Sequence, residues 1–131
     1  MILGVTGSRV ITDRKYIYDY LDKYSRINKI TEVVSGKAKG PDTIGEEWAI
    51  SRGYPFTPFP PIKEEIDLYG KKAFFLRNER MADYCHKAVI FWDGKSSGTS
   101  NMMYNMRKRN KDYQVIVYRL ENKQDFFNPE D

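Results

Sequence analysis

The sequence has few of the residues that hold a disulfide framework or a structural metal. Its 131 residues include one cysteine, Cys85, and one histidine, His86. A single cysteine excludes an internal disulfide, and these two residues are too few soft ligands for a structural zinc site. We therefore expect a reduced compartment, no metal, no cofactor, and structural roles for both residues.

Long apolar segments are missing as well. The N-terminal segment MILGVTGSRV has an apolar run of only four residues, Ile2 to Val5. Such a run is far shorter than a signal-peptide core or a membrane span. Internal repeats and low-complexity tracts are also missing from the sequence. We expect a soluble, cytoplasmic protein that is not exported and does not use a membrane.

Length and composition favour one folded domain. Hydrophobic residues make up 40% and aromatic residues 15% of the chain, which is more than a disordered chain contains. A chain of 131 residues needs only one core. We predict one domain over residues 1–121 and a short polar tail over 122–131. The net charge of +4 suits an anionic small ligand and does not require a nucleic acid.

Short runs of apolar, β-branched and aromatic residues predict five strands. The second is expected to begin near Lys29 or Ile30 and to stop at Gly36. The third covers 54–59, and its prolines favour a short or edge strand. The remaining strands are predicted over 2–5, 88–92 and 113–118.

Helical spacing appears between these strands. Apolar residues from 17 to 27 follow the i, i+3, i+4, i+7 pattern of one helix face. A second helix is expected over 41–53, with Thr43 and Glu46 as a capping box. Two further helices are predicted around 73–84 and 102–109. This alternation predicts an α/β fold, namely a Rossmann-like, doubly wound, mainly parallel five-stranded sheet with helices on both faces.

Glycine- and serine-rich loops follow the first, second and fourth predicted strands. In an open parallel sheet, ligands bind at the carboxyl ends of the strands, where loops lead into helix N-termini. Glycines allow a close backbone approach, and the N–H groups of a helix N-terminus favour phosphate. The spacing matches neither a P-loop nor GxGxxG, so these loops predict an anion or nucleotide site. The alternative is that glycine and serine only form tight turns.

Four motifs of the sequence, in order, resemble those of the YspA-like branch of the SLOG superfamily. They are Gly7-Ser8-Arg9, SGKAKGPD from Ser35 to Asp42, Arg77-Asn78-x-x-Met81, and FWDGKSSGT from Phe91 to Thr99. The resemblance spans nearly the whole chain. It implies a Rossmann-like sheet with a site for nucleotides or nucleotide-derived molecules. LOG phosphoribohydrolases and the DNA-processing protein DprA belong to the same superfamily.

The resemblance also raises the question of catalysis. LOG-type enzymes cleave an N-glycosidic bond with an arginine of Arg-Lys-x-x-Met and a glutamate of Pro-Gly-Gly-x-Gly-Thr-x-x-Glu. Arg77 aligns with that arginine, but Met102 stands where the glutamate would be. Methionine can neither stabilise an oxocarbenium-like centre nor activate water. We therefore expect no LOG-type catalysis unless Asp42, Glu46 or Asp93 supplies a carboxylate.

Several residues allow a structural and a functional interpretation. Asp42 is expected either to bind ribose hydroxyls or to cap the helix after Pro41. Arg77 would bind the ligand or form a solvated ion pair with Glu79 or another helix neighbour. Trp92 would belong to the core or stack on a base. The basic cluster 107–111 suits a solvated helix end better than a nucleic-acid patch.

The sequence therefore predicts a protein that binds a phosphorylated nucleotide or nucleotide-derived signal molecule, either to sense or to sequester it. One alternative is a nucleotide-processing enzyme that hydrolyses an N-glycosidic bond, and another is a DprA-like nucleic-acid-binding protein. Ten tyrosines and seven phenylalanines lead us to expect a homo-oligomer. Arg77 is the one catalytic candidate. The predicted ligand-binding residues are Gly7, Ser8, Arg9, Ser35, Gly36, Lys37, Ala38, Asp42, Arg77, Asn78, Asp93, Gly94, Ser96, Gly98 and Thr99.

Overall fold

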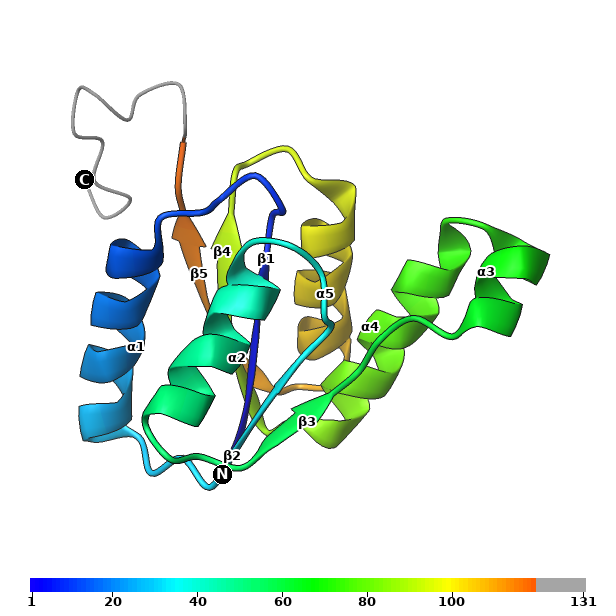
Figure 1. Cartoon of the computed structure of the whole chain (residues 1–131). Coiled ribbons are helices and arrows are strands. Elements are labelled where there is room, and N and C mark those ends of the chain that lie inside the picture. Colours follow the sequence, from blue (N-terminus) through cyan, green and yellow to red (C-terminus); the bar gives the residue numbers. More distant parts are fainter. Residues whose placement is uncertain (120–131) are drawn as a thin grey trace.

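A parallel sheet of five strands lies at the centre of the computed structural model, which describes residues 1–119 (Figure 1). All neighbouring strands pair in parallel in the order β3-β2-β1-β4-β5. The predicted mainly parallel five-stranded sheet is confirmed, with the predicted edge strand β3 at one border. The strands are β1 (Ile2–Gly7), β2 (Glu32–Ser35), β3 (Phe56–Pro58), β4 (Lys87–Trp92) and β5 (Asp112–Val117).

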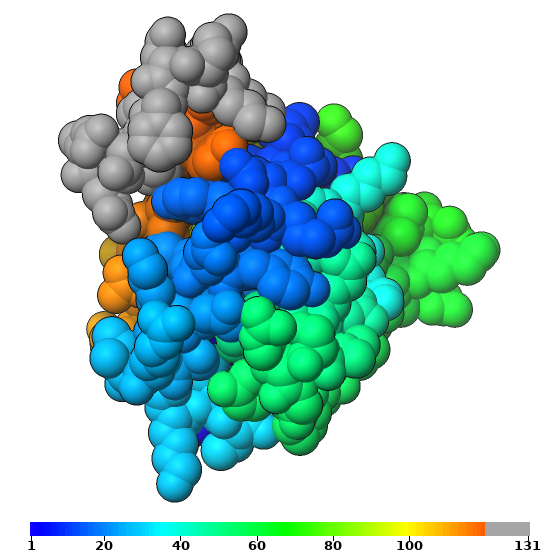
Figure 2. Space-filling model, turned by 60° about the vertical axis from the view of Figure 1, so that its left-hand side comes forward, coloured from blue at the N-terminus to red at the C-terminus, as the bar shows by residue number. Residues whose placement is uncertain are grey.

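Helices cover both faces of this sheet. Alternate residues of β4 point to opposite sides: Val89 and Phe91 join one apolar cluster, and Ala88 and Ile90 join the other. The first cluster lies under α1 and α2, whose side chains largely hide the sheet in Figure 2. The second lies under α4 and α5. The helices of residues 1–119 are α1 (Arg14–Ile27), α2 (Pro41–Ser51), α3 (Lys63–Tyr69), α4 (Lys72–Tyr84) and α5 (Ser97–Lys108).

Two features differ from the sequence predictions. The capping box predicted for α2 is wrong, because Gly40 is the N-cap and Thr43 donates its hydroxyl to the carbonyl of Ala38. Gly40 has φ 79°, a left-handed conformation that favours glycine over a capping side chain. Helix α3 was not predicted from its sequence. It has no buried residue and projects from the body of the molecule beside α4 (Figure 1).

The ends of the described region set two further limits. Within residues 1–119, no helix is long and apolar enough to span a bilayer. The polar tail predicted over 122–131, and the last residues of the predicted domain, lie outside the described residues.

His86 and Cys85 have structural roles, since His86 Nδ1 accepts a hydrogen bond from the backbone of Ile2 and Cys85 is fully buried.

Candidate functional site

A cavity of about 400 Å³ opens at the carboxyl ends of β1 and β4. After β1 the chain builds β2 and β3 on one side, and it then returns to place β4 on the other side of β1. The loops that leave β1 and β4 therefore diverge at this point, which is where open α/β sheets form ligand crevices. Most of the predicted ligand-binding residues line the cavity: Gly7, Ser8, Arg9, Ala38, Asp42, Arg77, Asn78, Asp93, Ser96, Gly98 and Thr99.

Asp42 holds the loop after β2 in place from the first turn of α2. It is 1% exposed, and its Oδ1 accepts a hydrogen bond from the hydroxyl of Thr6 at 2.7 Å. Its Oδ2 accepts from the backbone N–H groups of Gly36 at 2.9 Å and Ala38 at 3.4 Å. Burial raises the pKa of Asp42, while Thr6, the charge of Arg77 and these N–H groups oppose the shift. Both carboxylate oxygens are thus used inside the protein.

Asp93 has the same kind of role in the loop after β4. Its Oδ1 accepts hydrogen bonds from the backbone of Ser96 at 2.8 Å and of Lys95 at 2.9 Å, and from the Ser8 hydroxyl at 3.1 Å. Burial works against the charged form, but these three donors together hold the pKa of Asp93 below its usual value. Asp93 is therefore an ionised group that ties the loop after β4 to the loop after β1.

Arg77 enters the cavity from α4 and is 7% exposed. Its Nη1 donates to the carbonyls of Gly36 and Phe59, and its Nε donates to Oδ1 of Asn78. A Cβ on Gly36 would lie 2.3 Å from this Nη1, so the loop after β2 needs glycine there. The alternative prediction of a solvated ion pair between Arg77 and Glu79 is not observed.

Burial lowers the pKa of Arg77, Asp42 opposes this shift, and the charges of Arg9 and Arg80 add to it. An arginine remains protonated in proteins even so. The second cation, Arg9, belongs to the loop after β1 and lies over the ring of Phe74, with 5.4 Å between its Cζ and the ring centroid. The cavity thus has two guanidinium groups near one another.

The N-terminus of α5 forms another wall. Ser96 is the N-cap, and its Oγ lies 3.5 Å from the backbone nitrogen of Thr99. Asn78 donates its Nδ2 to the carbonyl of Gly98 and to Oδ1 of Asn101, which connects α4 to this turn. The first N–H groups of a helix have no partner within the helix and carry partial positive charge. This wall of the cavity therefore favours a negative group.

Four predicted residues do not line the cavity. Ser35 donates its hydroxyl to the carbonyl of Asp42, and Gly36 contacts the rear of Arg77. Lys37 forms an ion pair with Glu46 at 2.8 Å. Gly94 has φ 85° and provides the turn after β4. These residues determine the conformation of the loops. Sequence position alone does not distinguish a residue with that role from one that lines the cavity.

Other lining residues were missed. Phe74 and Phe75 occur on α4 shortly before Arg77, where the sequence indicates only an apolar helix face. The spacing of three residues between Phe74 and Arg77 places them on one helix face and is the signal that was available, whereas the spacing of two for Phe75 gives none. Ser97 follows the predicted residue Ser96 and also lines the cavity. The lining residues outside the predicted set are Thr6, Val10, Lys71, Phe74, Phe75 and Ser97.

Two residues considered for chemistry lie elsewhere. Met102 is 1% exposed and packs in the apolar cluster under α4 and α5. Trp92 does not line the cavity, and its Nε1 donates to the carbonyl of Ser96. No group of three or more histidine, cysteine or acidic side chains in residues 1–119 could hold a metal ion.

Comparison with known proteins agrees with this fold. The sequence profile of the YspA, cpYpsA-related SLOG family (YAcAr) matches residues 1–64. The Gene 61 protein of Mycobacterium phage D29 is 37% identical over 111 residues, which cover 79% of this chain and 86% of that protein. DNA processing protein A (DprA) from Streptococcus pneumoniae has a similar structure, with a TM-score of 0.70 at 19% identity over 92% of this chain. This chain spans about half of DprA, since 51% of that protein is covered.

The fold and the position of the cavity define a Rossmann-like α/β protein with a crevice where its strand order reverses. The chain belongs to the YspA, cpYpsA-related SLOG family. The likeness to DprA shows a shared fold.

Proposed function

We propose that this protein binds a phosphorylated nucleotide or nucleotide-derived signal molecule in the cavity, to sense or sequester it, without LOG-type cleavage. The observation that carries the proposal is the pair of guanidinium groups of Arg9 and Arg77 in a cavity whose carboxylates already accept backbone hydrogen bonds. Such a cavity offers two guanidinium charges to an anion, and the hydrogen bonds that Asp42 and Asp93 accept offset the charge of these carboxylates.

Size and lining also support a small nucleotide. Pockets for small molecules range from about 300 to 1,000 Å³, and this one is about 400 Å³. Ser96, Ser97 and Thr99 bring hydroxyl groups to the N-terminus of α5. Phe74 and Phe75 add aromatic surface beside them. Phosphate suits the first group of residues, and the flat surface of a base suits an aromatic ring such as that of Phe75, since the Phe74 ring already contacts Arg9 and Arg77.

Hydrolysis of an N-glycosidic bond remains the second candidate because of Asp93. Its Oδ2 has no hydrogen-bond partner within residues 1–119, so one carboxylate oxygen in the cavity is available. Two facts favour binding over hydrolysis. The lowered pKa makes Asp93 a weak base at neutral pH, and Met102 is part of the core.

The third candidate, a nucleic-acid role like that indicated by the name of DprA, has the shared fold and the net charge of +4 in its favour. A bound strand needs cations that are accessible along a groove. Arg77 is instead recessed among Gly36, Phe59 and Asn78. That arrangement suits one small anionic group better than a long backbone.

Titration calorimetry against nucleoside monophosphates, dinucleotides, cyclic nucleotides and ADP-ribose tests the proposal. We expect one of these to bind to the wild type, and about 10-fold weaker binding or worse for Arg9→Ala, since a charge-assisted hydrogen bond contributes about 1.5–3 kcal/mol. Chromatography of the same mixtures would detect free base or nicotinamide, which would favour hydrolysis. Binding of single-stranded DNA that weakens steeply with salt would favour the nucleic-acid role. If none of the small molecules binds, the proposal is wrong.

A further inference from the structure

One aromatic ring contacts both arginines of the cavity. The Cζ atoms of Arg9 and Arg77 lie 5.4 Å and 5.8 Å from the centroid of the Phe74 ring. Arg77 reaches the ring from the next turn of α4, whereas Arg9 comes from the loop after β1. Cations within about 6 Å of an aromatic centroid are attracted to its face. The Phe74 ring therefore contacts two positively charged side chains that come from separate elements.

Within the described residues, no carboxylate lies at ion-pair distance from either charge, although Asp42 acts on Arg77 from farther away. Within residues 1–119, neither guanidinium takes part in an ion pair, and the Phe74 ring is the one direct contact found for Arg9. Nη2 of Arg77 also makes no hydrogen bond there. No side-chain nitrogen that is buried in this part of the chain lacks a partner, so Nη2 is not fully buried, and Arg77 lines the cavity.

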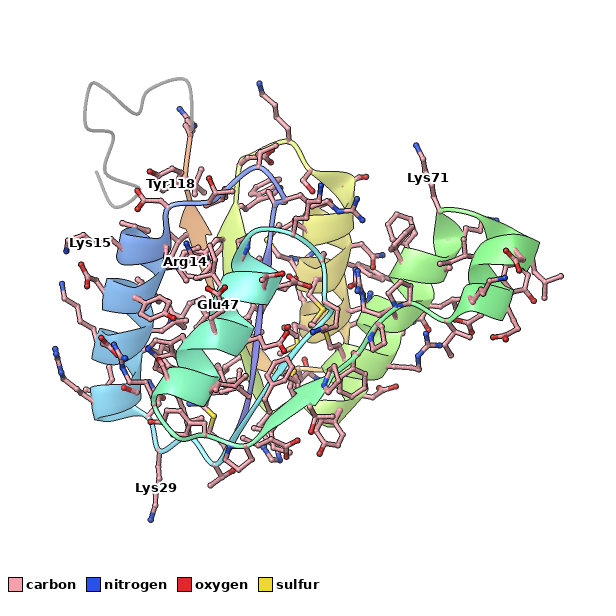
Figure 3. The ribbon with its side chains drawn as sticks, in the orientation of Figure 1. Arg14, Lys15, Lys29, Glu47, Lys71 and Tyr118 are labelled. Atoms are coloured by element: carbon pink, nitrogen blue, oxygen red, sulfur yellow. The ribbon has the colours of Figure 1, made fainter. Side chains whose placement is uncertain are left out.

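Lys71 does not complete this cluster. Although it borders the cavity, Figure 3 shows its side chain extending from the turn between α3 and α4 into solvent. The cavity is thus lined by two guanidinium groups that both contact the ring of Phe74. Burial lowers the pKa of Arg77 most, Asp42 opposes this shift, and repulsion from Arg9 lowers the pKa further. A ligand that neutralises both charges relieves this repulsion.

We propose that Arg9 and Arg77, held on Phe74, form a clamp that selects a terminal phosphate, that is, a phosphomonoester, over a phosphodiester. This inference rests on the proposed function and narrows it to ligands with an unesterified phosphate end. Phe74 is a positioning residue that acts through the two arginines.

Charge and geometry give the physical reason. A phosphomonoester carries a charge of about −1.5 to −2 at pH 7 and has three acceptor oxygens. A diester carries a single charge and has fewer free oxygens, so it cannot neutralise two arginines or accept from both forks. Each guanidinium is planar and binds phosphate oxygens in a fixed geometry. Removing one arginine should therefore weaken binding of the monoester more than binding of the diester.

The experiment compares two pairs of probes by calorimetry: AMP with its 5′-methyl ester, and phenyl phosphate with methyl phenyl phosphate. We expect the wild type to bind each monoester about 10-fold more tightly than its diester. Arg9→Gln should lower monoester affinity about 10-fold and leave a preference below about 3-fold. Arg9 is exposed, so this variant should fold. The control Arg26→Gln removes an exposed arginine at the end of α1, outside the cavity, and should bind as the wild type.

Phe74 is tested by the monoester-to-diester ratio, which a general loss of stability would not change. Phe74→Leu should reduce the ratio as Arg9→Gln does, and Phe74→Tyr should preserve it because the ring remains. An equal affinity for monoester and diester, or a ratio that Arg9→Gln and Phe74→Leu leave unchanged, would overturn the clamp. AMP binding without discrimination would overturn the clamp alone. Discrimination of phenyl phosphate without binding of AMP or of any other nucleotide named above would support the clamp and contradict the nucleotide function.

Discussion

Gly98→Ala separates stability from ligand binding at the N-terminus of α5. Gly98 is the second residue of that helix, and a Cβ added to it would meet no heavy atom within 4 Å. Alanine restricts the unfolded chain and suits a helix better than glycine, so the free protein should gain about 0.5 kcal/mol. For a chain of this size that gain corresponds to a rise of about 2 °C in the melting midpoint.

The same methyl group should weaken ligand binding. Gly98 lines the cavity, and its missing side chain leaves the first N–H groups of α5 open to a phosphate. A Cβ there would keep the anion from one charge-assisted hydrogen bond, which is worth about 1.5–3 kcal/mol or about 10-fold in affinity at the least. Thermal unfolding of the free protein and calorimetry with the tightest-binding nucleotide measure the two effects.

Gly94→Ala is the matched control. A Cβ on Gly94 also meets nothing within 4 Å, but Gly94 has φ 85° and lies outside the cavity lining. Alanine in this left-handed conformation should cost about 1 kcal/mol, while affinity should not change. If Gly98→Ala binds the ligand as the wild type does, the ligand does not approach the N-terminus of α5. If Gly98→Ala is less stable than the wild type in the free state, the structure is wrong in leaving open space around this residue.

Three further predictions concern groups outside the cavity. Lys111→Met should cost about 1–3 kcal/mol in urea unfolding, because Lys111 Nζ donates to three carbonyls at the end of α4. Hydrogen bonding from Arg52 helps to lower the pKa of Asp22 to about 2, against an ordinary 3.8. The ionised Asp22 carboxylate should contribute about 1 kcal/mol to the free energy of unfolding after solvent screening. This contribution should be complete above pH 4 and lost as the pH falls toward 2, and Asp22→Asn should remove this part of the acid transition. Burial raises the pKa of Cys85 to about 11, so a thiol reagent at pH 8 should modify it only in denaturant.

The sheet could be predicted from the sequence because its signals are local. Buried parallel strands need continuous apolar residues, and the segments around Val33 and Ile90 have them. The site followed from a general rule, that loops after parallel strands meet at one edge. This rule brought Ser8, Asp93 and Thr99 to the same cavity although they are far apart in the sequence.

What the sequence could not indicate depends on tertiary contacts. Helix α3 buries none of its residues and so shows no apolar face of the usual kind. Phe74 has the same residue type as a core phenylalanine, and its contact with Arg9 arises only when α4 packs beside the loop after β1. The cluster 107–111 was expected to be a solvated helix end. Its Arg109 pairs with Asp83 at 2.6 Å and its Lys111 caps α4.

The positions of Met102 and Arg77 explain why a single change would not convert this site into a LOG-type one. Met102 packs against the core beneath α5, so a glutamate there would place a charge among apolar side chains and away from the cavity. Burying such a charge costs several kcal/mol unless it is paired. To pair with such a glutamate, Arg77 would have to give up its hydrogen bond to the carbonyl of Gly36 in the loop after β2. The same hydrogen bonds would, on the proposed function, hold Arg77 in position for an anion.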